Sequence, residues 1–224
     1  MQRIFFDTLP PENSDGPYVG VFVQKIGSRQ YHCGFSVFSA SGAVEVIHLQ
    51  FSGIITTELP KEPMLYVLCD VDSFRADTIT DRAMQIARRH QNIAIKFAFS
   101  SPETEWFSEG GFALLGEDNI GLTCSHFVLA LFGFAGLPLA QVGTWPDRPE
   151  DREWQERMIG RIRDSLYEVT DEAATHLERV ATEIGMKRVR PDEVGGAALA
   201  DEADLPVRFD QVLDYSRIVR ERFD

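Results

Sequence analysis

Cysteine is scarce in this chain, with three residues among 224: Cys33, Cys69 and Cys124. They are odd in number and far apart, and the sequence has neither a CxxC nor an HExxH motif. This pattern argues against a disulfide scaffold and against a structural zinc site. We therefore expect a reducing compartment, the cytoplasm, and a protein that uses neither a metal nor a cofactor.

Positive charge is also in short supply, because 22 Lys and Arg face 35 Asp and Glu, giving a net charge of −13. An acidic surface is unsuited to nucleic acid or to an anionic membrane. No apolar run is long enough to cross a bilayer, and residues 1–7 lack the apolar region and cleavage site of a signal peptide. We expect no nucleic-acid partner and no stable membrane association.

Hydrophobic periodicity predicts a mixed chain in two parts. Strands are expected at 17–24, 31–38, 43–51 and 64–71, and helices at 77–90, from Cys124 to about 135, in two apolar stripes after residue 145, and at 209–223. Residues 195–204, small and acidic, are expected to form a loop. The predicted fold class is α+β, an antiparallel sheet packed on a central cysteine-bearing helix. Residues 1–145 would form the main domain and 146–224 an acidic helical extension.

The apolar run that begins at Leu122 lacks the stripe of a surface helix and predicts a helix buried on all sides. Thr123 is the expected N-cap, so Cys124 falls in the first turn. There the free backbone N–H groups and the helix dipole favour a thiolate. A buried cysteine is more commonly a small apolar core residue, so position alone leaves both interpretations open.

The hairpin upstream supplies two histidines. If Ser39 to Ser41 form a three-residue loop, Phe38 faces Gly42 and His32 lies opposite His48. A two-residue loop would shift the register by one and separate them. Near a helix N-terminal cysteine, one imidazole could accept the thiol proton and the other could orient it.

Oxyanion stabilisation needs backbone or side-chain donors close to the nucleophile. The N–H of Cys124 can serve as one such donor. The second donor stays open among four candidates: Tyr18, Gln24, Gln30 and Tyr31.

These segments resemble the circularly permuted papain-like proteins, in which the histidine strand precedes the cysteine helix. The strand pattern is His32, any residue, Gly34, three largely apolar positions, a turn with glycine, and an apolar strand that ends in His48. The segment from Thr123 to Val128 is similar to the Asn-Cys-x-His-Phe signature of lecithin:retinol acyltransferase-like proteins. It also resembles the Asn-Cys-Asn-x-Phe signature of permuted deSUMOylating isopeptidases. Thr123 stands where these signatures usually have Asn.

The resemblance spans about residues 18 to 137 and implies roles for three residues: Cys124 as nucleophile, His32 as base and His48 as the third polar member. It implies a permuted papain-like catalytic domain of the NlpC-like kind. The expected activity is hydrolysis of an amide, isopeptide or thioester bond through an acyl-enzyme, on a protein, peptide or acyl substrate.

Two alternatives stay open beside this hydrolase. One is an acyltransferase or phospholipase of the lecithin:retinol acyltransferase type. The other is a non-catalytic interaction module whose cysteine and histidine have drifted apart. Of the remaining residues, Cys33 is expected in the core, His90 on the surface at a helix end, and Trp145 and Trp154 in helix docking.

Overall fold

The computed structural model describes residues 3–6, 17–27, 30–39, 43–60, 63–99, 105–116, 120–165 and 170–223. The strands are β1 Ile4–Phe6, β2 Tyr18–Gly27, β3 Gln30–Phe38, β4 Val44–Leu49, β5 Ile55–Glu58 and β6 Leu65–Leu68. The helices are α1 Ser73–Arg89, α2 Cys124–Phe134, α3 Pro149–Ser165, α4 Asp171–Thr182, α5 Pro191–Leu199 and α6 Phe209–Glu221, with short 3-10 turns at η1 Val142–Thr144 and η2 Glu202–Asp204.

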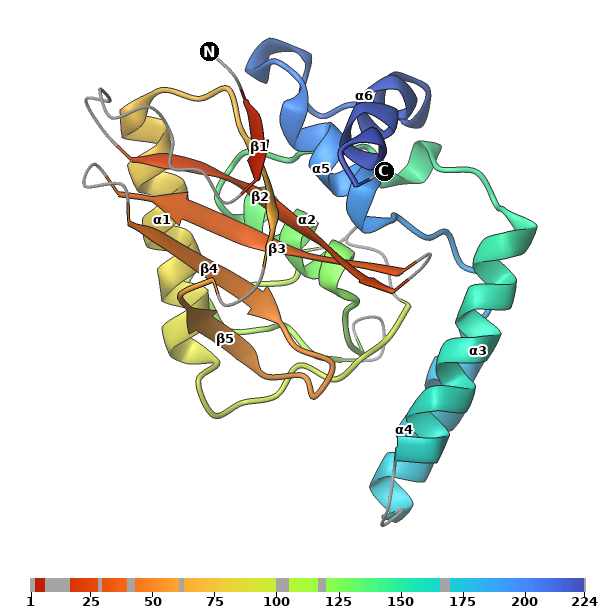
Figure 1. Cartoon of the computed structure of the whole chain (residues 1–224). Coiled ribbons are helices and arrows are strands. Elements are labelled where there is room, and N and C mark those ends of the chain that lie inside the picture. The colour runs from red at the N-terminus through yellow and green to blue at the C-terminus, as the bar shows by residue number, and fades with distance from the viewer. Residues whose placement is uncertain are drawn as a thin grey trace.

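The strands form one sheet in the order β1-β6-β2-β3-β4-β5, and every neighbouring pair is antiparallel (Figure 1). The predicted α+β class and antiparallel sheet are confirmed. Two short strands, β1 and β5, were not expected, because three or four residues carry too little alternation to be recognised by themselves. The equally short β6 was expected, because it lies in the continuous apolar run 64–71.

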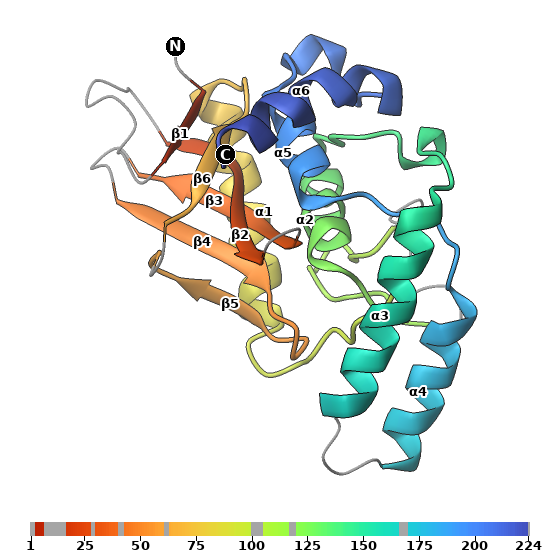
Figure 2. The ribbon, with the colours of Figure 1, turned by 45° about the vertical axis from the view of Figure 1, so that its right-hand side comes forward.

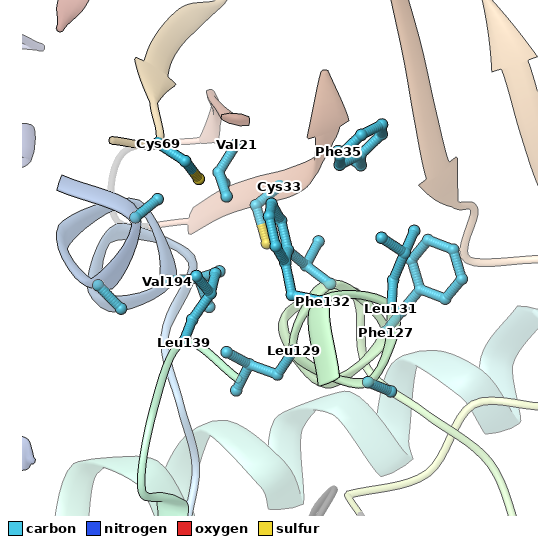
Figure 3. Close-up of a cluster of buried hydrophobic side chains, with 14 of the residues drawn as sticks. Val21, Cys33, Phe35, Cys69, Phe127, Leu129, Leu131, Phe132, Leu139 and Val194 are labelled. Atoms are coloured by element: carbon cyan, nitrogen blue, oxygen red, sulfur yellow. The ribbon is translucent and has the colours of Figure 1, made fainter. Parts of the chain in front are cut away.

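Helices α1 and α2 cover one face of this sheet (Figure 1). Helix α1 begins at the N-cap Asp72, whose carboxylate accepts a hydrogen bond from the N–H of Arg75 at 2.8 Å, and it buries one apolar stripe. Helix α2 is buried on all sides from Ser125 to Phe132, as its composition predicts. Figure 3 shows its aromatic and aliphatic side chains facing β3, where the rings of Phe35 and Phe132 meet at 5.6 Å.

The opposite face of the sheet carries a second, smaller apolar cluster. It comprises Phe22, Phe38, Val46, Met64, Tyr66 and Leu68. Because side chains alternate along a strand, the even-numbered residues of β2 and β3 point to this face and the odd-numbered ones to α2. His32 and His48 are therefore on the Phe22 face, whereas Cys33 points toward α2.

The segment 195–204, expected as a loop, is largely helical, and that prediction was wrong. Helix α5 runs through Gly195 and Gly196 and packs on β2, β3 and α6. A Cβ at Gly195 would lie 2.9 Å from Cγ2 of Val23, and one at Gly196 would lie 2.7 Å from the backbone N of Ser216. The small residues that weaken helix propensity thus permit close packing, and tertiary contacts outweigh propensity.

Helices α3 and α4 form an antiparallel pair beside the sheet (Figure 2). Their apolar faces enclose the extended segment 97–99 in a separate cluster with Met158, Ile159, Leu177 and Val180. Helices α5 and α6, in contrast, contribute residues such as Val194 and Val219 to the core beneath the sheet. The division of the chain at residue 145 stays a prediction.

The hairpin register differs from the expected one. Phe38 pairs with Val44, and the N–H of Ser39 donates to the carbonyl of Ala43 at 2.9 Å, so the strands are offset by two residues from the expected register. Residues 40–42, including Gly42, lie outside the described residues. Because the side-chain period of a strand is two, this shift leaves His32 and His48 on the same face.

Gly34, rather than His32, lies across from His48 in this register. A Cβ at residue 34 would lie 2.6 Å from the Cβ of His48 and would overlap the Phe22 ring. The glycine therefore leaves the space in which the His48 ring bends toward His32. This gives the His-x-Gly spacing a steric reason.

The hydrogen-bonded ladder of β3 and β4 ends at the pair Phe35 and Ile47, although β3 extends to Gln30 and β4 to Leu49. Gly34 and His48 are still in close contact, and the strands part beyond them, where residues 30–32 and 49–51 line a cavity. The separated strand ends are the part of the sheet that α2 approaches with its first turn, as the shared cavity described below shows.

We predict that Gly34→Ala lowers the free energy of unfolding by about 1–3 kcal/mol, because the new methyl group overpacks the space between Phe22 and His48. The matched control is Gly133→Ala in α2, where an added Cβ meets nothing within 4 Å. This control should gain about 0.5–1 kcal/mol from helix propensity. Urea denaturation measures both; equal stability of Gly34→Ala and the parent would contradict the steric argument.

Candidate active site

Cys124 is the first residue of α2. Thr123 has extended backbone angles (φ −82°, ψ 167°) and its hydroxyl accepts a hydrogen bond from the N–H of His126 at 3.2 Å, so it is the N-cap that the sequence predicts. Threonine therefore performs the capping role at the position where the resembled signatures have asparagine. Cys124 is partly exposed, whereas the eight residues that follow it are buried.

A chain of hydrogen bonds links three side chains on the opposite face of the sheet. Nε2 of His32 lies 3.0 Å from Nδ1 of His48, and Nε2 of His48 lies 3.2 Å from Oε1 of Glu58. Glu58 comes from β5 and is paired with Val46. Val46 lies two residues before His48 on β4, so Glu58 and His48 are on the same face of the sheet. The expected His–His contact is present, and a carboxylate extends it.

The carboxylate assigns the protons along this chain. An ionised Glu58 only accepts, so Nε2–H of His48 donates to it and Nδ1 of His48 accepts from Nε2–H of His32. His48 is then neutral. Its pKa lies below the ordinary value, first because burial disfavours the charged ring and second because of the positive charge of His32. The second ring nitrogen of His32 is left for Cys124.

His32 and Cys124 are coupled by charge and by a hydrogen bond. Burial lowers the pKa of His32, but the attraction and the hydrogen bond to Cys124 outweigh it, so the pKa is raised. The pKa of Cys124 lies well below that of an ordinary thiol. A thiolate–imidazolium pair is the state these shifts favour.

Cys33 is the largest single cause of the low pKa of Cys124, through a hydrogen bond to its sulfur. Burial opposes this effect, and the charge of His32 adds to it. Burial raises the pKa of Cys33 itself well above the ordinary value, so Cys33 stays a thiol and donates. Its sulfur also lies 3.8 Å from the Ser125 hydroxyl, and Figure 3 shows Cys33 between β3 and α2.

Arg188 brings a second positive charge toward this cysteine. Its guanidinium lies over the Trp154 ring at 3.6 Å and pairs with Asp151 at 3.3 Å. Burial lowers the pKa of Arg188 to about 10, and the charges of Asp151 and Cys124 partly offset that effect. Arg188 therefore remains charged at neutral pH and further favours the thiolate.

Cys124 and His32 open on the same cavity of about 390 Å³, a volume within the range of small-molecule sites. Residues 30–32 of β3 line it together with Leu49, the last residue of β4, and the two residues that follow, and α3 closes the other side. A cavity of about 460 Å³ at the far end of α2 has neither cysteine nor histidine among its lining residues in the part of the chain that the structure describes.

The four candidate second oxyanion donors lie at different distances from this site. Tyr18 pairs with Phe38, at the opposite end of β3 from His32, whereas Gln24 pairs directly with His32. Gln30 and Tyr31 line the cavity. The side-chain carbonyl of Gln30 accepts a hydrogen bond from Arg161 at 2.9 Å, which leaves its amide N–H groups to donate elsewhere.

Several expectations for other residues can now be compared with the structure. Cys69 is a buried core residue, and burial raises its pKa to about 12. Trp145 docks α5 as expected, with its indole N–H donating to Glu193 at 2.9 Å. His90 is not on the surface: its ring contacts the carbonyl of Ile93 at 3.3 Å and accepts from the N–H of Ala113 at 3.0 Å, so it anchors the segment 105–116.

Sequence reasoning missed two features of the site: the residue Glu58, and the contact of Cys33 with Cys124. Glu58 ends a β-branched segment, Ile55-Thr56-Thr57, whose composition is typical of a strand but whose length is short. The position of Cys33 next to His32 predicts the face it points to, but not that the first turn of α2 lies there.

Over the described ranges, no group of three or more His, Cys, Asp or Glu side chains could hold a metal ion. Among the helices of those same ranges, none combines the length and the apolar character that crossing a bilayer requires. Comparison with known proteins found no matching family model, curated protein or solved structure. The assignment of the site therefore depends on its geometry.

We predict that Cys33→Ala raises the pKa of Cys124, because the thiolate loses its principal hydrogen-bond donor. In the parent protein, alkylation by iodoacetamide should change little between pH 8.5 and 6.5, whereas an ordinary thiol slows on the order of fiftyfold over that range. The variant should approach the ordinary profile.

Cys33→Ser, which retains a donor, should stay closer to the parent. Cys69→Ala is the matched control, since Cys69 has no part in the site. Rates measured by mass spectrometry of the peptide that contains Cys124 decide the matter. An unchanged pH profile in Cys33→Ala would show that Cys33 is only a core residue.

Proposed function

We propose that this protein is a cysteine-dependent hydrolase of an amide, isopeptide or thioester bond, with the permuted papain-like arrangement of its site. The observation that carries the proposal is the coupled pair of Cys124 and His32 on one cavity, with His32 bonded to His48 at 3.0 Å. Nucleophile, base and orienting group then follow one another as in a triad.

The first half of the reaction forms an acyl-enzyme. The Cys124 thiolate attacks the substrate carbonyl carbon, and the electron pair of the C=O bond moves to oxygen. The backbone N–H of Cys124, which precedes the first helical hydrogen bond, donates to that oxyanion. When the carbon–nitrogen or carbon–sulfur bond breaks, the leaving group takes the proton of the His32 imidazolium, and a thioester to Cys124 remains.

The second half releases the acid. Neutral His32 accepts a proton from water as the water oxygen attacks the thioester carbonyl, and breakage of the carbon–sulfur bond restores the thiolate with the imidazolium beside it. His48 accepts the Nε2–H of His32 throughout, and Glu58 keeps His48 in the tautomer that can accept. His48 therefore acts by orienting the base.

The coupling of Cys124 to His32 also weighs against the alternative of a non-catalytic module. In that alternative the two groups would have drifted apart and side chains would fill the space between them. Here they interact, and the space beside them is a cavity. A partly buried ionic pair that stabilises no bound group or transition state would be costly to retain, which also favours a catalytic role.

We predict that Cys124→Ala and Cys124→Ser abolish labelling by an alkyne-bearing acyloxymethyl ketone, because the attacking sulfur is gone. Cys69→Ala, which removes a different buried thiol, should be labelled as the parent is. Intact mass gives the extent of labelling, and circular dichroism verifies that each variant is folded. Equal labelling of the parent and Cys124→Ala would refute the assignment of the nucleophile.

We further predict graded losses along the hydrogen-bond chain. His48→Ala leaves Nε2–H of His32 without its acceptor and should lower kcat by about a hundredfold or more. Glu58→Gln allows either amide orientation and should cost about tenfold. The exposed Glu45 on β4 is the control, since Glu45→Gln should leave kcat unchanged. A Glu58→Gln variant with full activity would remove Glu58 from the chain.

A further inference from the structure

The cavity beside Cys124 has an apolar part large enough to select an acyl group. Its apolar lining is formed by Leu49, Phe51, Phe97, Leu122, Trp154 and Met158. Leu49 and Phe51 lie at the end of β4 and just beyond it. Phe97 precedes the segment 105–116 and Leu122 follows it, and Trp154 and Met158 belong to α3. A small acyl group would leave most of this apolar surface in contact with water, so a large one gains more on binding.

Helix α3 presents the cavity with a wall of fixed shape. Trp154, Met158 and Arg161 recur at helical spacing, so they lie on one face of α3, and all three line the cavity. The Trp154 ring is stacked by Arg188 at 3.6 Å on one side and meets the Phe99 ring at 5.8 Å. Because the ring is packed in this way, the wall is preorganised before a substrate binds.

A second part of the cavity is polar and lies on the side of His32. The leaving group takes its proton from His32, so it must depart along this side. Gln30 is two residues from His32, on the same face of β3. Arg161 donates to the side-chain carbonyl of Gln30 at 2.9 Å, which positions a guanidinium on the path of the leaving group.

Arg161, unlike Arg152 and Arg157 on the same helix, has no carboxylate partner among the residues that the structure describes. Arg157 pairs with Glu153 at 3.8 Å and Arg152 with Glu156 at 3.3 Å. Over the residues that the structure describes, Arg161 bonds to the neutral Gln30 and to no carboxylate. In a chain with 35 Asp and Glu, a guanidinium that no carboxylate of the described ranges neutralises, at a cavity that contains the nucleophile, is available to an anion of the substrate.

We propose that the preferred substrates carry a large apolar acyl group and a leaving group with an anionic substituent, a carboxylate or a phosphate, which Arg161 binds. This inference rests on the proposed hydrolase activity and adds the substrate class. The acyl chain occupies the apolar lining of the cavity, between Leu49 on one side and Met158 on the other, and the anion lies beside Gln30 and Arg161.

The test is a matched set of thioesters hydrolysed by the full-length protein. S-octanoyl-3-mercaptopropionate carries a carboxylate, S-octanoyl-N-acetylcysteamine is neutral, S-octanoyl-phosphopantetheine carries a phosphate, and S-acetyl-3-mercaptopropionate has a short acyl group. Thiol release measures kcat/KM. We expect the octanoyl carboxylate to exceed both the neutral and the acetyl compound by about tenfold or more. The ratio of the carboxylate and phosphate compounds identifies the anion.

Arg161→Met should abolish the preference for the anionic leaving group and leave the octanoyl-to-acetyl ratio unchanged. Arg157→Met, on the same helix, should retain both preferences. Equal rates for the neutral and anionic thioesters, or an unchanged preference in Arg161→Met, would overturn the inference while the hydrolase activity stands. Absence of turnover of every thioester would also overturn the inference about the substrate. The proposed hydrolase function would fail as well only if Cys124 were also unreactive toward the acyloxymethyl ketone probe.

Discussion

The end of the β3–β4 ladder at Phe35 and Ile47, with the strands parting just beyond Gly34 and His48, is the constraint on which the site depends. As long as two strands are hydrogen-bonded, side chains on opposite faces of the sheet cannot meet. Where the ladder ends, His32 from one face can reach Cys124, whose helix packs on the other. The same separation opens the cavity between residues 30–32 and 49–51. One departure from regular sheet geometry thus brings Cys124 and His32 together and opens the cavity beside them.

The pair of Cys124 and His32 also shows how a partly buried charge is tolerated. Removing a thiolate and an imidazolium from water is costly, and the cost is offset only where each has partners with good geometry. Cys124 has Cys33, His32 and the start of α2; His32 has Cys124 and His48, and His48 has Glu58. Each member is engaged on two sides, so the network is satisfied from the helix N-terminus to β5. Satisfied polar networks of this kind also restrict the geometry to one arrangement.

The C-terminal residues contribute to this arrangement rather than merely following it. Trp145 bonds to Glu193, and Arg148 pairs with Asp151 and Glu193, so the connector, α3 and α5 are joined by buried polar contacts. Arg188 extends this group toward Trp154 and Cys124. The charged residues that make the extension look like a solvated appendage therefore include the ones that fix α3 beside the cavity.

Much of the fold could be predicted from the sequence because the signals are local. The β-branched alternation of β2 to β4, the apolar composition of α2 and the threonine cap before Cys124 each determine their own element. Helix α5 could not be predicted in this way. Its Gly195-Gly196 pair is a poor helix former, and the segment is helical because residues without a Cβ allow contact with Val23 and Ser216.

For the candidate site, the sequence alone determined the residue types and their places: a cysteine at a helix start, and two histidines and a glycine whose spacing puts them on one face of the sheet. Tertiary structure alone decided the two-residue register, the end of the β3–β4 ladder, the arrival of Glu58 from β5 and the contact of Cys33 with Cys124. The physical reason is that side-chain alternation and helix capping are properties of neighbouring residues. Strand separation and the proximity of two charged groups depend on how distant segments pack.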